Sequence, residues 1–122
     1  MPETGPTFRL LVTGDLHYDL RGKDSRLIKE LAGRVCASDA DALVVAGDVS
    51  PADNERLTTC LDLFSGFKGE KLIVPGNHDL WTLEGDSEQI YREQFPAAAL
   101  EAGFHMLDGH PVQFGPVAVV GN

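Results

Sequence analysis

Three short apolar runs, each ended by a glycine or by Pro-Gly and separated by amphipathic stretches, constrain the fold of this chain most strongly. The runs cover residues 8–13, 42–46 and 71–74 and consist mainly of Leu, Val, Ile and Ala. Continuous apolar runs of this length are typical of strands that are buried on both faces of a parallel sheet. Parallel neighbours need a crossover connection, which is usually a helix. The pattern therefore predicts an α/β fold that begins with a βαβαβ unit.

The stretches between the runs have the apolar spacing of helices. The first has Asp24 or Ser25 as a possible cap, and the second has Asp53 or Asn54. The apolar positions are Leu27, Ile28, Leu31, Ala32, Val35 and Cys36 in the first, and Leu57, Cys60, Leu61 and Phe64 in the second. Neither cysteine belongs to a CxxC pair. We interpret both as small buried side chains in a reducing compartment, not as metal ligands.

The pattern changes after the third run. A helix is predicted over residues 87–95 with Asp86 as its cap, and a short helix over 97–102 ends at Gly103. Three short strands are predicted at residues 104–107, 111–114 and 117–120. We expect these strands to start a second sheet, and we expect 117–120 to be a strand of the buried type. A chain of 122 residues is most simply a single domain.

Metal-ligand residue types follow each of the first three runs. The clusters are Gly14-Asp15-Leu16-His17, Gly47-Asp48 and Gly76-Asn77-His78-Asp79. Ligands of open α/β sheets bind outside the carboxyl ends of the strands, so the clusters should converge. Asp, His and Asn suit a pair of divalent ions such as Mn, Fe, Zn or Co, and one carboxylate can bridge two ions. Two ions about 3.5–4 Å apart polarise a phosphoryl group and lower the pKa of bound water towards about 7.

The order Asp-x-His, Gly-Asp, Gly-Asn-His-Asp, each after a strand, resembles the calcineurin-like metallophosphoesterase superfamily. The resemblance covers roughly residues 10–81. The resemblance implies a role for each matching residue. Among the metal ligands, Asp15 and His17 ligate the first metal, Asp48 bridges the two metals and Asn77 ligates the second. His78 contacts phosphate and donates a proton, and Asp79 orients His78.

The same resemblance implies a four-layer α/β/β/α sandwich, of which residues 1–122 would be the βαβαβ half of a partial domain. The C-terminal half would then be missing. It also implies hydrolysis of phosphate mono- or diesters by a metal-bridging hydroxide, with two divalent metal ions such as Mn, Fe or Zn. The superfamily completes its site with a later Gly-His-x-His element, but here Gly109-His110 is followed by Pro111 and Val112. We interpret His105 as a structural or surface histidine.

Two alternatives stay open from the sequence. One is a truncated, catalytically incomplete fragment or scaffold that retains the metal motifs. The other is a phosphate- or nucleotide-binding module of another α/β class, although neither GxxxxGK[ST] nor GxGxxG occurs.

Charge and hydropathy narrow the possible partners. Ten basic and nineteen acidic residues give a net charge of −9, which argues against nucleic-acid binding. No apolar run approaches the roughly 20 residues of a membrane span, and no signal peptide is recognisable. We therefore expect a cytoplasmic protein that acts on a phosphorylated substrate of unknown class.

Overall fold

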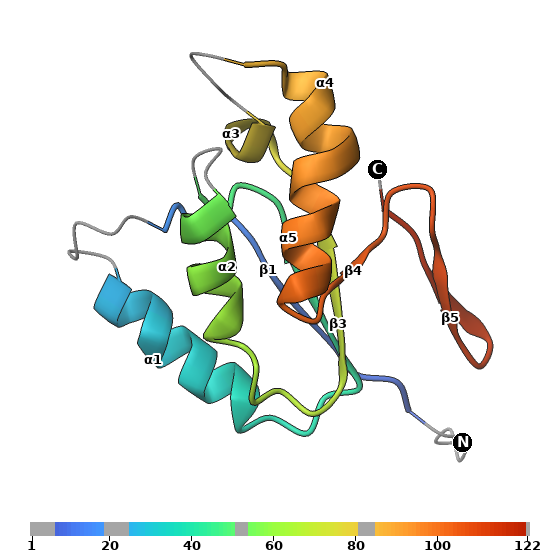
Figure 1. The fold of residues 1–122 in the computed structure, drawn as a ribbon. Helices are drawn as coiled ribbons and strands as arrows, with labels where there is room; N and C mark the ends of the chain where they lie inside the picture. The colour runs from blue at the N-terminus through green and yellow to red at the C-terminus, as the bar shows by residue number, and fades with distance from the viewer. Residues whose placement is uncertain (1–6, 19–24, 51–53, 81–84, 122) are drawn as a thin grey trace.

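The first three apolar runs form neighbouring strands of one parallel sheet (Figure 1). The computed structural model describes residues 7–18, 25–50, 54–80 and 85–121. The sheet contains β1 (Leu10–Thr13), β2 (Ala42–Ala46), β3 (Glu70–Val74) and β4 (His105–Met106), in that order. Each strand pairs in parallel with the next. The predicted α/β fold is confirmed.

Helices α1 (Ser25–Cys36) and α2 (Asn54–Asp62) connect the first three strands. Each buries one apolar stripe: Ile28, Ala32 and Val35 from α1, and Leu57, Cys60 and Leu61 from α2, with Phe64 just beyond its end. The placement of Leu27 in the first stripe was wrong, because its side chain is 58% exposed. One residue before Ile28, it is turned about 100° around the helix, away from the sheet.

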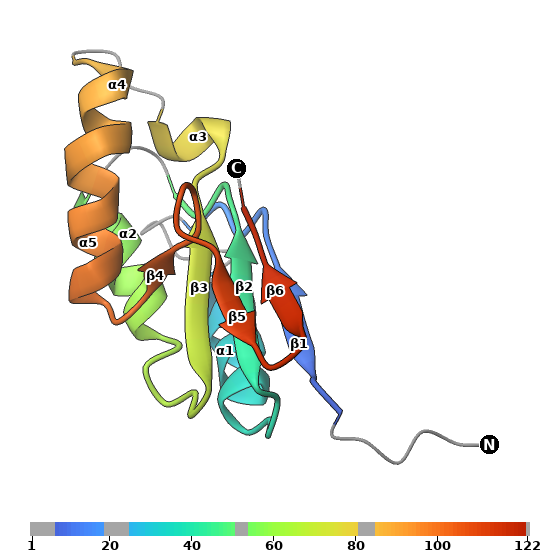
Figure 2. The ribbon, with the colours of Figure 1, turned by 90° about the vertical axis from the view of Figure 1, so that its right-hand side faces the viewer.

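A single helical rod follows β3 where two helices were predicted (Figures 1 and 2). It consists of α4 (Ser87–Gln89), a π-helical stretch η1 (Ile90–Gln94) and α5 (Phe95–Glu101). The predicted cap is confirmed, because Oδ1 of Asp86 accepts a hydrogen bond from the Glu88 amide at 2.9 Å. Gly103 follows the helix with φ of 82°, as predicted for its C′ position. A short helix before the rod, α3 (Asn77–Leu80), was not predicted.

Strand β4 belongs to the first sheet, which corrects the expectation that it starts a second one. Its pairing with β3 is parallel, with Leu72 opposite His105 and Ile73 opposite Met106. The rod between β3 and β4 is therefore a crossover helix that returns the chain to the amino-terminal edge of the sheet, where a parallel strand can begin. Strands β5 (Val112–Phe114) and β6 (Val117–Val119) form the second, antiparallel sheet.

The two faces of the first sheet are covered differently. Helices α1, α2 and α5 pack on one face around Leu43, Val45 and Ile73. The β5–β6 hairpin lies on the other face, against Ala42, Val44, Leu72 and Leu107 (Figure 2).

The buried strand expected at residues 117–120 is also corrected. Val117 is 39% exposed and Val120 73% exposed, although Val119 packs against the first sheet. Val117 pairs with Phe114 beside the hairpin turn, and Val120 lies on the face opposite Val119 because successive side chains of an extended segment alternate. Within the described ranges, no helix is long and apolar enough to cross a membrane.

Candidate metal centre

Asp15, His17 and Asp48 meet at the carboxyl edge of the sheet. Asp15 and His17 follow β1, and Asp48 follows β2. One potential ligand atom from each lies within 4.8 Å of the other two. Nε2 of His17 is 4.0 Å from Oδ1 of Asp15, and these side chains are 50% and 80% exposed. The Asp48 residue is half-buried. Two carboxylates and an imidazole therefore face one small volume that is open to solvent.

The backbone at these three residues is left-handed. The φ angles are 52° at Asp15, 46° at His17 and 52° at Asp48, and no other described residue except glycine has a positive φ. Asp and His tolerate this region better than most side chains, but it still costs free energy, on the order of 1 kcal/mol per residue. Strain of this kind persists where the surrounding structure enforces it, and it is concentrated at functional sites.

Backbone hydrogen bonds hold the loop after β1 against the loop after β2. The amide of Asp15 donates to the Gly47 carbonyl at 3.1 Å, and the amide of His17 donates to the Asp48 carbonyl at 3.0 Å. The Tyr18 amide adds a bond of 2.6 Å to the Val49 carbonyl. These bonds continue the pairing of the two strands beyond their ends. They fix the positions of Asp15 and His17 relative to Asp48.

Two motif glycines allow the loops after β2 and β3 to pack backbone against backbone. A Cβ on Gly47 would lie 2.8 Å from the Gly76 nitrogen, and the φ of Gly47 is 81°. A Cβ on Gly76 would overlap Oδ1 of Asp48 and lie 2.5 Å from the Asp48 nitrogen. Gly76, the first residue of the third cluster, therefore leaves the space that the Asp48 carboxylate occupies.

Asp79 is a buried carboxylate, 3% exposed, behind the cluster. Its Oδ1 accepts hydrogen bonds from the amides of Val49 at 2.8 Å and Ser50 at 3.0 Å, and its Oδ2 accepts one from Gly76 at 2.8 Å. Burial raises the pKa of this carboxyl, while the backbone hydrogen bonds, including one from Asp48, lower it. The predicted contact with His78 stays a prediction, because the His78 side chain lies outside the described structure, as does that of Asn77.

A family model described as calcineurin-like phosphoesterase matches residues 8–118. The chain belongs to this family. A stretch of 55 residues is 42% identical to the "[Acyl-carrier-protein] phosphodiesterase PptH" of Mycobacterium tuberculosis (strain ATCC 25618 / H37Rv). The match covers 45% of this chain and 17% of that protein, so the chain corresponds to a small part of its relative.

The donor set of this family member fits the divalent ions that the family implies. Carboxylate oxygens with one imidazole nitrogen suit Mn, Fe or Zn, and the three atoms are close enough to ligate one ion. Asp48 has a second oxygen, which is what a bridging ligand needs. The identity and number of ions, and the ligand roles of the individual residues, stay predictions.

His105 and His110 bond within their own loop. Nε2 of His105 bonds the His110 carbonyl at 2.9 Å, and Nδ1 of His110 bonds the Asp108 carbonyl at 3.0 Å. Both side chains are exposed, and neither belongs to the metal-binding group found among the described residues. This arrangement agrees with the interpretation of His105 as a structural or surface histidine.

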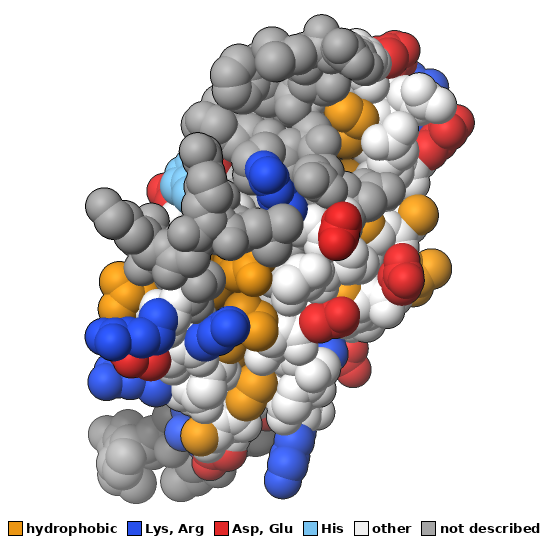
Figure 3. Space-filling model, turned by 60° about the vertical axis from the view of Figure 1, so that its left-hand side comes forward, with side chains coloured by type: hydrophobic (Ala, Val, Ile, Leu, Met, Phe, Trp, Pro, Cys, Tyr) orange, Lys and Arg blue, Asp and Glu red, His pale blue; other side chains and the backbone are white. Residues whose placement is uncertain are grey.

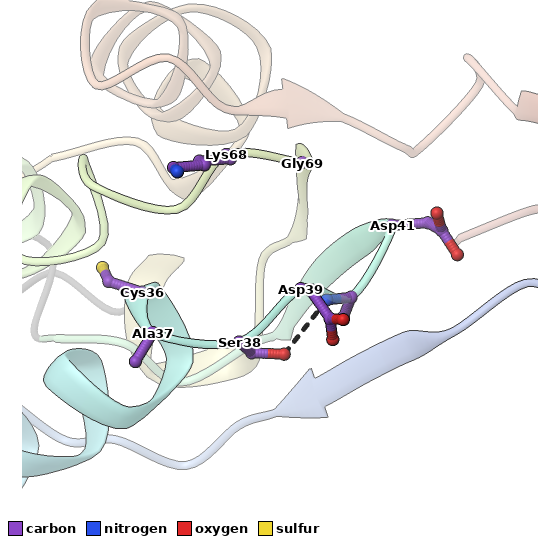
Figure 4. Close-up of a pocket in the computed structure, with 8 residues that line it drawn as sticks. Cys36, Ala37, Ser38, Asp39, Asp41, Lys68 and Gly69 are labelled. Atoms are coloured by element: carbon purple, nitrogen blue, oxygen red, sulfur yellow. Dashed lines mark hydrogen bonds between the residues drawn. The ribbon is translucent and has the colours of Figure 1, made fainter.

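A cavity of about 540 Å³ lies at the opposite edge of the sheet, before β2 and β3 (Figure 4). It is lined by Cys36, Ser38, Asp39, Lys68 and Gly69, among others. The Ser38 hydroxyl oxygen accepts a hydrogen bond from the Ala40 amide at 3.1 Å. This cavity is therefore separate from the metal-ligand cluster.

Sequence reasoning missed the way in which Asp79 joins two loops. The motif identified the residue but gave it a contact with the neighbouring His78. Its hydrogen bonds to the loop after β2 span about thirty positions, 30 to Val49 and 29 to Ser50. The only signal in the sequence was that Asp79 immediately precedes Leu80 in a short segment after the third apolar run. This signal is too weak to identify the hydrogen-bond partners of the carboxylate.

Proposed function

We propose that this chain carries the metal-binding residues of a metal-dependent phosphoesterase that hydrolyses phosphate mono- or diesters. The observation that carries the proposal is the convergence of Asp15, His17 and Asp48 within 4.8 Å at the carboxyl edge of a parallel sheet. Membership of the calcineurin-like phosphoesterase family supports the same reaction class.

Each motif residue has a task in this proposal. Bound divalent ions would polarise the phosphoryl oxygens and make water a better nucleophile near neutral pH. Asp15 and His17 would hold one ion, Asp48 would contribute to both, and the amide oxygen of Asn77 would ligate the second. His78 hydrogen-bonds the phosphate and donates a proton from its ring nitrogen to the leaving oxygen.

We propose phosphodiesters as the first substrates to test, because the relative from M. tuberculosis is named as a phosphodiesterase. The protein surface itself is not built to attract anions, since the net charge is −9. In the view of Figure 3, acidic and basic side chains occur on the same face. Bound cations would reverse the sign of the field locally and so admit a phosphorylated group.

The test is turnover of bis(p-nitrophenyl) phosphate and p-nitrophenyl phosphate with added Mn²⁺. We expect Asp48→Asn to lower the rate at least 100-fold, because it removes the shared charge between the ions. Asp62→Asn is the matched control, since Asp62 is an exposed carboxylate on α2, and it should leave the rate unchanged.

A well-folded chain with no turnover on either substrate contradicts the proposal and favours the incomplete fragment or scaffold. Turnover that is equal in Asp48→Asn and wild type contradicts the assigned site.

A further inference from the structure

The buried carboxylate of Asp79 accepts hydrogen bonds from two separate loops. One oxygen accepts the amides of Val49 and Ser50 in the loop after β2, and the other accepts the amide of Gly76 in the loop after β3. The Asp48 amide is hydrogen-bonded to the same carboxylate. Several successive amides turned towards one point form a concave anion-binding nest. Here the anion in the nest is a side chain of the protein.

The position is costly for a carboxylate. Its side chain is 3% exposed, and a buried charge is tolerated only where hydrogen bonds replace its hydration. An apolar residue of similar size would avoid this cost but would leave at least three amides without an acceptor. The arrangement therefore stabilises one particular loop geometry.

That geometry is transmitted to all three ligand side chains. Asp48 immediately precedes the clamped amides of Val49 and Ser50, and it has a left-handed backbone. The carbonyl of Asp48 accepts the His17 amide, and the Gly47 carbonyl accepts the Asp15 amide. A continuous series of hydrogen bonds therefore runs from Asp79 through the loop after β2 to the loop after β1.

We propose that Asp79 is a positioning residue that organises the metal-ligand loops by clamping the backbone that follows Asp48 to the loop after β3. This inference rests on the proposed metal-dependent function. This role differs from the predicted one, in which Asp79 orients His78. The hydrogen bonds of Asp79 hold the ligand loops before any substrate is bound. Their effect should therefore be visible in metal affinity and in the metal-free protein.

Asp79→Asn tests the clamp with little change in volume. The amide oxygen can still accept the hydrogen bonds of Val49 and Ser50, but the NH₂ group then faces the Gly76 amide, donor against donor. Asp79→Ala removes every acceptor. Phe64→Leu is the control: it perturbs a fully buried core side chain beyond the end of α2 and lowers stability without removing any hydrogen bond of Asp79.

The measurements are Mn²⁺ affinity by calorimetry and amide hydrogen exchange in the metal-free protein. We expect Mn²⁺ affinity to fall about tenfold in Asp79→Asn and further in Asp79→Ala, the size of effect seen when groups supporting metal ligands are removed. Exchange at Val49, Ser50 and Gly76 should accelerate more than exchange in β2. Phe64→Leu should keep wild-type affinity even if it lowers the melting temperature as much as Asp79→Asn does.

Wild-type affinity in both Asp79 variants overturns the inference and leaves the proposed function standing. Equal loss of affinity in Phe64→Leu and Asp79→Asn also overturns it, because the effect would then follow stability alone. Failure of the wild-type protein to bind Mn²⁺ overturns the proposed function, and the inference with it.

Discussion

Replacing Gly76 by alanine should destabilise the protein, whereas the same replacement at Gly33 should stabilise it. A Cβ on Gly76 would lie 2.5 Å from the Asp48 nitrogen, where ordinary contacts are 3.4–4 Å. The loop after β2 would have to move by roughly an ångström, and overpacking of this kind costs about 1–3 kcal/mol. The neighbouring atoms include backbone, so rotation of a side chain cannot relieve the overlap.

Gly33 is the matched control because its surroundings are empty. It lies in the interior of α1, and a Cβ there would meet nothing within 4 Å. Alanine in an exposed helix interior is more stable than glycine by about 0.5–1 kcal/mol. The two variants have the same chemical change, so their difference isolates the packing at Gly76.

Thermal and urea unfolding of the metal-free proteins measure the difference. In a protein of this size, 1 kcal/mol corresponds to roughly 3–5 °C in melting temperature. We expect Gly76→Ala to melt at a lower temperature than wild type and Gly33→Ala at a higher one. If Gly76→Ala is as stable as wild type or more stable, the close approach of the two loops is refuted.

Four further predictions concern buried side chains and one helix cap. Burial raises the pKa of the Cys60 thiol to about 12, so this thiol stays protonated in the folded state, whereas an unfolded thiol ionises near pH 9. The free energy of unfolding should therefore fall as the pH rises above 9. This fall should be smaller in Cys60→Ala. A thiol reagent at pH 8 should modify half-buried Cys36 but not Cys60 until the protein unfolds, and equal rates would contradict the burial of Cys60. Asp86→Ala should cost about 1 kcal/mol in urea unfolding through the lost bond to the Glu88 amide, and an unchanged midpoint would contradict the cap. Phe95→Ala should cost about 3–5 kcal/mol, because its side chain is 1% exposed, and a loss below 1 kcal/mol would contradict its place in the core.

The fold could be predicted where local periodicity decides the structure. Strand β2 was predicted to the residue, because Ala42–Ala46 is apolar throughout and closed by Gly47. The assignment of β4 to the wrong sheet had a different cause. Strand His105–Met106 has two residues, which carry no periodicity of their own. Its partner β3 is more than thirty residues away, and only the crossover helix between them determines the pairing.

The candidate site was predictable as a meeting of strand ends but not as a network. Asp15, His17 and Asp48 could be expected together because parallel strands end at one edge of a sheet. The left-handed backbone at all three residues could not be expected, since Asp and His occur in many conformations. The role of Asp79 was equally hidden, because its partners are backbone amides, which every residue except proline possesses.

Paramagnetic broadening of backbone amide signals by Mn²⁺ tests the central claim most directly, because it locates the cation without requiring turnover. With substoichiometric Mn²⁺, the account predicts that the amides of Asp15, His17, Asp48 and their neighbours broaden first, and that Asp48→Asn weakens this effect. Broadening that begins at exposed carboxylates elsewhere, such as Asp39 or Asp62, and spares these three residues would contradict it.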